Sequence, residues 1–281
     1  MELSQLEIRI ARTPSLPLLS SAASEIMGMA DHHTNIREYE RIILRDPALA
    51  ANILRAANSA YYGGDGSLTN LSQAIARLGI NTVRSICITA AFHCSLNGRR
   101  LHKLFDSQSF WQHSLAVACS CKILAAMIHY SDPELAFIAG LLHDIGKPAL
   151  YMFLPLQMNL VHETVQSENL TQFQAEYAIM QFTHQECGRL VAGRWQLPAV
   201  YHEAIGNHHD PMSYGQEPDT LALLVHMGNA LAHRAGITCI LGEADAGFDE
   251  AVVAELDLDV EQFDALAKII AAEVAKLSFQ Q

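Results

Sequence analysis

Apolar residues recur along most of the chain at steps of three and four positions. This spacing matches the 3.6 residues of a helical turn, so it predicts amphipathic helices with one buried face each. Sustained alternation of apolar and polar residues, which would indicate half-buried strands, is absent. The pattern therefore predicts an all-α fold.

Capping residues mark the starts of several predicted helices. Ser, Thr, Asp and Asn accept hydrogen bonds from the free N–H groups of a first turn, and Pro fits the first helical position. The predicted starts are Asp46-Pro47, Asn70 with Gln73, Ser131 or Asp132 with Pro133, Thr183 with Glu186, Leu197-Pro198, and Asp259 with Gln262. Gly79 should end the helix that Asn70 opens, and the helix after Thr183 should run to about Trp195.

The length of 281 residues and the 50% share of hydrophobic residues are enough for one large core or two small ones. We expect an N-terminal helical subdomain over residues 1–100, a second subdomain over 101–240 and a C-terminal helical extension over 241–281. A polar stretch at residues 96–100 is the expected linker between the first two. No internal repeat is evident.

The net charge of −12 disfavours nucleic acid as a partner, because phosphate binding needs clustered Lys and Arg. No apolar run approaches the roughly 20 residues that span a bilayer, and the N-terminus does not resemble a secretory signal. The six cysteines form no CxxC pair and are expected to be reduced core residues. A cytoplasmic location without membrane contact is therefore expected; the oligomeric state is left open.

Histidines supply the candidate chemistry of the chain. His143 and Asp144 lie together in GLLHDIGK, His113 precedes them, and His184 and the pair His208-His209 follow. Imidazole and carboxylate bind divalent transition metals, and a carboxylate can bridge two ions that clamp a phosphoryl group and activate water. A single histidine on an apolar helix is more often a hydrogen-bonded core residue. The ordered series makes a metal site the sharper hypothesis.

The same order resembles that of HD-superfamily phosphohydrolases, all-helical proteins named after the His-Asp pair. More specifically, residues 8–235 resemble the HDOD signalling proteins. The phrases that carry this resemblance are SLPLLSSAASEI, RDPALAANILRAANSAYYG, LSQAIARLGINTVRSICI, FWQHSLAVA, AFIAGLLHDIGKPALY, HQECGRLVAGRWQLP and AIGNHHDP. The resemblance implies an N-terminal helical bundle packed on an HD-like helical core.

The resemblance also implies roles for the matched positions. His113, His143 and Asp144 match ligands of a first metal ion, and Asp144, His184, His208 and His209 match those of a second. The implied cofactor is a divalent transition metal (Fe, Mn, Zn or Ni), as one or two ions. Asp144 and Lys147 are the implied catalytic pair, with Lys147 where HD proteins often place a phosphate-binding lysine. The alternative interpretation of Lys147 is a solvated side chain at a Gly-Pro boundary.

Three departures from the family patterns weaken the catalytic prediction. Asn229 stands where HD hydrolases usually carry a last aspartate, and a neutral amide is the weaker ligand. HHDPMSYGQEP lacks the Gly-Tyr-Pro signature of the HD-GYP phosphodiesterases. Ser109 stands where some of those enzymes carry an acidic ligand for a third ion.

Three functions are therefore open. The first, which the resemblance to HDOD proteins implies, is a signalling module that binds a partner protein or a small phosphorylated ligand. The second is a metal-dependent phosphohydrolase acting on a nucleotide or phosphoester. The third is a fold that an ion merely stabilises.

Overall fold

A computed structural model describes residues 3–13, 21–29, 35–59, 67–96, 101–212, 218–240 and 247–278. Within these ranges the chain forms helices and turns and no strand, which confirms the all-α prediction. The chain divides into two compact units, residues 1–16 with 98–194 and 199–281, and residues 17–97 with 195–198. The three-part division expected from the sequence stays a prediction, and residues 97–100 of the expected linker lie outside the described residues.

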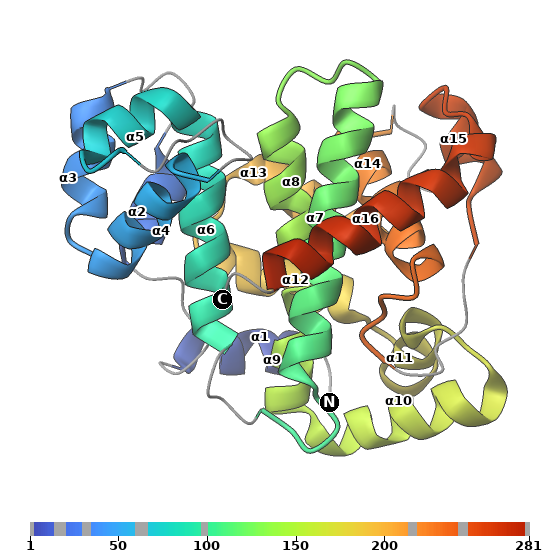
Figure 1. The fold of residues 1–281 in the computed structure, drawn as a ribbon. Coiled ribbons are helices and arrows are strands. Elements are labelled where there is room, and N and C mark those ends of the chain that lie inside the picture. The colour runs from blue at the N-terminus through green and yellow to red at the C-terminus, as the bar shows by residue number, and fades with distance from the viewer. Residues whose placement is uncertain are drawn as a thin grey trace. The chain divides into compact units, whose positions relative to one another are not determined.

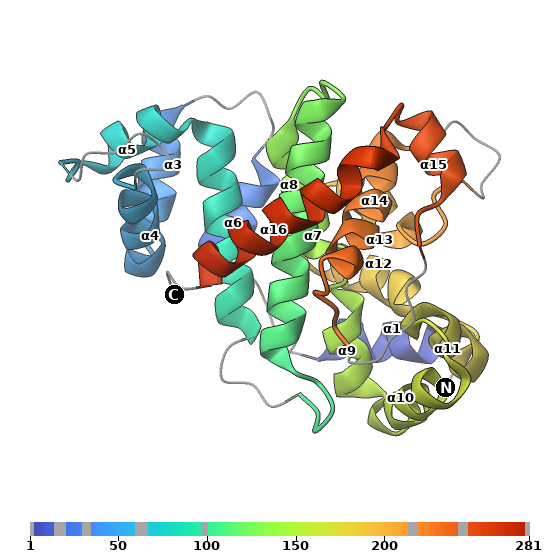
Figure 2. The ribbon, with the colours of Figure 1, turned by 45° about the vertical axis from the view of Figure 1, so that its right-hand side comes forward.

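The larger unit is organised around α7 (Ser107–Met127), which is 21 residues long. It packs against α8 (Pro133–Leu142), α14 (Thr220–Arg234) and α16 (Phe263–Ser278), and α16 lies across it in both views (Figures 1 and 2). The remaining helices of this unit are α1 (Leu3–Arg12), α9 (Gly146–Phe153), α10 (Pro155–Glu168), α11 (Gln172–Met180), α12 (His184–Arg194), α13 (Ala199–Asn207) and α15 (Glu250–Glu255).

Buried apolar side chains on all sides of α7 explain its central place. Leu115, Val117, Cys121 and Leu124 are at most 2% exposed. Around it, α12 packs against α9, α13 and α1, while α10 packs against α11. Helix α12 therefore lies beside both the helix that follows the His-Asp pair and the helix that precedes the His-His pair.

The smaller unit has its own core. It consists of α2 (Ser21–Gly28), α3 (Ile36–Ile43), α4 (Pro47–Ala57), α5 (Leu71–Leu78) and α6 (Ile80–Leu96). Its buried cluster includes Ile26, Ile43, Ile53 and Ile75, all fully buried. None of the chemistry-bearing histidines belongs to it.

Most predicted helix starts are confirmed. The Asn70 side chain accepts from the backbone N–H of Gln73, the Asp132 side chain accepts from the first turn of α8, and Gly79 ends α5 with φ 79°. Pro47 is the first residue of α4. The start at Asp259 is modified: Asp259 caps a short 3₁₀ turn, Val260–Gln262, and α16 begins after it.

No helix of the described ranges is by itself long and apolar enough to cross a membrane, although the bent pair Leu71–Leu78 and Ile80–Cys94 meets that criterion by length and composition. All six cysteines are free. Cys87, Cys121 and Cys187 are buried as expected, whereas Cys94 is exposed and so is not a core residue.

Candidate metal centre

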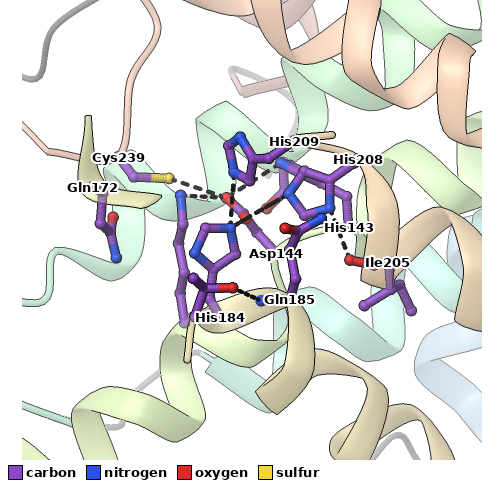
Figure 3. Close-up of polar contacts among 12 residues, drawn as sticks. His143, Asp144, Gln172, His184, Gln185, Ile205, His208, His209 and Cys239 are labelled. Atoms are coloured by element: carbon purple, nitrogen blue, oxygen red, sulfur yellow. Dashed lines mark hydrogen bonds and ion pairs between the residues drawn. The ribbon is translucent and has the colours of Figure 1, made fainter. Parts of the chain in front are cut away.

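The structure brings together every histidine that the sequence analysis assigned to a metal site. Figure 3 shows His143, His184, His208 and His209 gathered about Asp144. They come from different elements: His113 from α7, His143 and Asp144 from the turn between α8 and α9, His184 from the first position of α12, and His208 and His209 from the turn after α13. Their ligand atoms form two groups, His113 with His143 and Asp144, and His184 with His208 and His209. Within each group the atoms lie within 4.8 Å of one another.

Asp144 lies between the two groups and is fully buried. Its Oδ2 atom is 3.2 Å from Nε2 of His143 and 3.6 Å from Nε2 of His113. Its Oδ1 atom is 3.2 Å from Nε2 of His184 and 3.7 Å from Nε2 of His208. Each oxygen of one carboxylate thus faces a different group, which is the arrangement that a bridging ligand needs.

The histidine rings are held with their Nε2 atoms pointing inward. Nδ1 of His113 donates to the carbonyl of Ile237 at 2.9 Å, and Nδ1 of His143 donates to that of Gly140 at 2.8 Å. A carbonyl can only accept, so the proton is on Nδ1 and the Nε2 lone pair is free for a ligand. His208 follows the same pattern, with Nδ1 2.8 Å from the carbonyl of Ile205.

Buried polar atoms without hydrogen-bond partners test whether these residues fit a metal ion. Nε2 of His113, Nε2 of His143 and Oδ1 of Asp144 are all buried and lack such a partner. Leaving a buried polar atom unpaired costs about 1–3 kcal/mol each, so this concentration calls for a ligand. The residues present therefore fit a divalent transition metal.

The spacing within the second group agrees with that conclusion. Nε2 of His184 is 3.0 Å from Nε2 of His209 and 3.4 Å from Nε2 of His208. Two nitrogen ligands about 2.0–2.1 Å from one tetrahedral ion lie about 3.3 Å apart. These histidines are already at the separation that a shared ion requires.

Lys147 is not the solvated residue that the sequence left open. It is 5% exposed, and its Nζ lies 2.7 Å from Oδ2 of Asp144, one helical turn along the chain. Burial alone would raise the pKa of Asp144, but His143, Lys147 and His184 outweigh burial and hold that pKa well below its usual value. Asp144 is therefore an ionised carboxylate in the folded protein.

Burial lowers the pKa of His113, His208 and His209 well below the ordinary value of 6.5, so all three are neutral in the folded protein. In the unfolded chain they take up protons as the pH falls below 6.5, and the folded state does not follow. The metal-free protein should then lose about 3 kcal/mol of unfolding free energy between pH 6.5 and 5.5, about 1 kcal/mol per histidine. Urea denaturation with a chelator at each pH measures this slope.

A matched control for that pH slope is His129→Asn, at an exposed residue with φ 55° that asparagine tolerates. This variant should keep the slope of the wild type, whereas His113→Ala should reduce it. A stability that does not change over this pH interval would contradict the assignment of neutral, buried imidazoles.

Asn229 lies on the face of α14 that is turned toward the centre. His226, three residues before it, contacts the carbonyl of His208 through Nδ1 at 2.8 Å, and the ring of His233, four residues after it, is 5.5 Å from that of His113. Residues three and four apart share a helix face, so Asn229 faces the same side. Its Oδ1 is buried and lacks a hydrogen-bond partner.

Ser109, by contrast, donates to Asp106 in the cap of α7.

Three residues near the centre escaped the sequence analysis. Glu176 on α11 contacts Nδ1 of His184, the ring of Phe173 stacks on that of His209 with centroids 4.5 Å apart, and Sγ of Cys239 lies 3.8 Å from Oδ2 of Asp144. No spacing rule connects them to the histidines, because Phe173 and Glu176 lie on α11 and Cys239 lies after α14, apart from the elements that carry the histidines.

The fold and the site define the class: an all-helical protein in which two groups of histidines surround one aspartate. Comparison with known families agrees with this class. The family model for the HDOD domain matches residues 16–211. The chain belongs to the HDOD domain family.

Solved structures show the same fold. An HDOD domain protein of unknown function from Geobacter sulfurreducens is 22% identical, with a TM-score of 0.76, over 99% of this chain and 95% of that one. A protein proposed to act in signal transduction from Marinobacter aquaeolei is 24% identical, with a TM-score of 0.76, over 94% of this chain and 59% of that one. A protein proposed to be a phosphohydrolase from Shewanella amazonensis is 23% identical, with a TM-score of 0.70, over 98% and 93%.

Among curated proteins, an uncharacterized protein of Treponema pallidum is 24% identical over 204 residues, or 71% of this chain. The chain spans only 38% of the length of that relative. These similarities support the fold alone, so the chemistry of the centre has to be inferred from its own residues.

Proposed function

We propose that this chain is an HDOD signalling module that holds a divalent transition metal in its His/Asp centre and uses that centre to bind a small phosphorylated ligand. The observation that carries the proposal is the convergence of four imidazoles on the two oxygens of the buried Asp144, with the fifth, His209, beside His184. Unpartnered buried nitrogens and a fixed Nδ1 proton are what metal ligands need and what an ordinary core histidine does not show.

His113, His143 and Asp144 would hold one ion, and His184, His208 and His209 a second, with Asp144 shared. Imidazole with carboxylate suits Zn, Fe, Mn or Ni, and one or two ions are consistent with the two groups. Lys147 adds a buried ammonium beside the shared carboxylate, which gives a phosphate a cation to contact. A signalling protein that responds to the ligand is the proposed partner, in the cytoplasm.

Elemental analysis of protein purified without chelator tests the proposal. The wild type should contain one or two transition-metal ions per chain. His143→Ala removes a donor with 0% exposure, and its metal content should fall by at least about twofold. The exposed-site variant His129→Asn should match the wild type. Metal-free wild-type protein that also fails to take up added ions would overturn the proposal.

Phosphoester hydrolysis is the second candidate function, favoured by the position of Lys147. Its Nζ contacts the carboxylate of Asp144 at 2.7 Å inside the centre, so a phosphate bound beside the metal ligands could meet the ammonium. A bound metal would supply Lewis-acid chemistry there. The residues themselves would act by placing the phosphate: Lys147 would neutralise its charge, and the buried surroundings would limit the access of bulk water.

A panel of nucleotides and phosphoesters, assayed with the metal-loaded protein, separates the two candidates. Turnover that His143→Ala removes would establish hydrolysis. Binding of phosphorylated ligands without turnover would favour the signalling role. An ion that raises the melting temperature, with neither turnover nor ligand binding, would reduce the centre to a structural one.

A further inference from the structure

Glu176 is a second buried carboxylate behind the centre, and nothing in the proposed function uses it. It lies on α11 and is fully buried. Its Oε2 accepts from both the backbone N–H of His184 at 2.7 Å and Nδ1 of His184 at 2.6 Å. Its Oε1 accepts from the side chain of Gln172 at 2.6 Å. The side chain is therefore fixed at both oxygens, in one orientation.

The negative charge of Glu176 has no cation beside it. Among the described residues its only contact within ion-pair distance is His184, and no lysine or arginine pairs with it. A buried carboxylate that lacks a nearby positive charge is costly. The place where a positive charge would compensate it is the far side of the His184 ring, where Nε2 faces His208, His209 and Oδ1 of Asp144.

The two histidine groups differ in this respect. Oδ2 of Asp144, which faces His113 and His143, is already in contact with the ammonium of Lys147 at 2.7 Å. Oδ1, which faces the other group, lacks a hydrogen-bond partner. An ion at the first group has to compete with a lysine, whereas an ion at the second group meets a free oxygen and a histidine backed by a carboxylate.

We propose that Glu176 is a positioning residue that makes the group of His184, His208 and His209 the high-affinity half of the centre. It acts through His184, whose ring it orients and whose Nε2 it makes a stronger donor. The stacking of Phe173 on His209 places a second residue of α11 in the same role. This inference rests on the proposed metal centre and specifies which half of it fills first.

The isosteric variant Glu176→Gln separates charge from shape. Its amide oxygen can still accept both N–H groups of His184, and Gln172 can turn its amide to meet the new NH₂. The matched control is Glu163→Gln on the exposed face of α10. Both variants are prepared metal-free and titrated with Co²⁺, with the visible bands of bound Co²⁺ and equilibrium dialysis as readouts.

Glu176→Gln should lower the affinity for the first Co²⁺ ion by about 10–100-fold and alter the visible bands of the bound ion. Glu163→Gln should match the wild type in both respects. His208→Ala should weaken the first ion at least as much, and His113→Ala should weaken it less than Glu176→Gln does. Circular dichroism and urea denaturation of the metal-free variants check that Glu176→Gln remains folded, so that a purely structural loss is recognised.

An unchanged first-ion affinity in Glu176→Gln, or a larger loss in His113→Ala, would overturn the inference while leaving the metal centre intact. A wild-type protein that binds no Co²⁺ at all would overturn the metal centre together with the inference. Loss of folding in Glu176→Gln would assign the residue to stability and would also count against the positioning role.

Discussion

The metal-free Asp144→Asn protein should be about 3–5 kcal/mol less stable than the metal-free wild type. Asp144 and Lys147 are 0% and 5% exposed and pair at 2.7 Å, so the neutral amide removes the negative charge that the buried ammonium of Lys147 pairs with. Breaking a buried pair from one side costs more than the pair itself contributes. Urea denaturation in the presence of a chelator gives the difference in unfolding free energy.

The double variant Asp144→Asn with Lys147→Met is the control for that prediction. It removes both charges and puts an apolar side chain of similar length in place of the lysine, so it should recover at least half of the lost stability. Neither variant should retain the metal. An Asp144→Asn protein within about 1 kcal/mol of the wild type would show that the two charges are not coupled, against the geometry described above.

Gly146→Ala should destabilise the protein by at least about 3 kcal/mol, at the upper end of what overpacking costs. A Cβ atom at this position would collide with the carbonyl oxygen of His184 and would lie 2.6 Å from the backbone N of Gly188. Both are backbone atoms of α12, which cannot yield as a flexible side chain can. The collision can be relieved only by separating α9 from α12, and that also separates the two histidine groups.

Gly193→Ala is the matched control for Gly146→Ala. Gly193 lies on the exposed side of the same helix, α12, and a Cβ there would meet only one atom, 4.0 Å away. Since alanine is the better helix former, this variant should be about 0.5–1 kcal/mol more stable than the wild type. Thermal and urea denaturation measure both, and Co²⁺ binding should fall in Gly146→Ala alone. Equal stability of the two variants would contradict the close approach of α9 and α12.

The starts and ends of the helices could be predicted because capping residues and helix-ending glycines act on the backbone close to them in the sequence. Asn70, Asp132 and Gly79 act within a few residues of their own position, and their capping geometry is as expected. The start after Thr183 is partly so: the side chain of Glu186 accepts from the N–H of Thr183, but the Thr183 oxygen accepts from Gln185, one residue earlier than a capping box requires.

The candidate site needed the family resemblance, because the histidines lie up to 96 positions apart and no periodicity connects them. The resemblance identified which histidines belong to the site, and the structure shows that their ligand atoms lie close together. Glu176 and Phe173 could not be anticipated in this way. They reach His184 and His209 only because α11 ends at Met180, its cap residue Gln181 has a left-handed backbone with φ 61°, and the chain then turns back into α12.

One oxygen of Asp144 lies where two cations would share it. Oδ2 contacts Lys147 and also faces the donors of the first histidine group, so an ion held there would compete with the ammonium for this oxygen, and a phosphate could contact the ammonium in place of the carboxylate. Occupancy by metal and occupancy by phosphate are then thermodynamically linked. If a bound ion raises the affinity for phosphate by some factor, bound phosphate must raise the affinity for the ion by the same factor.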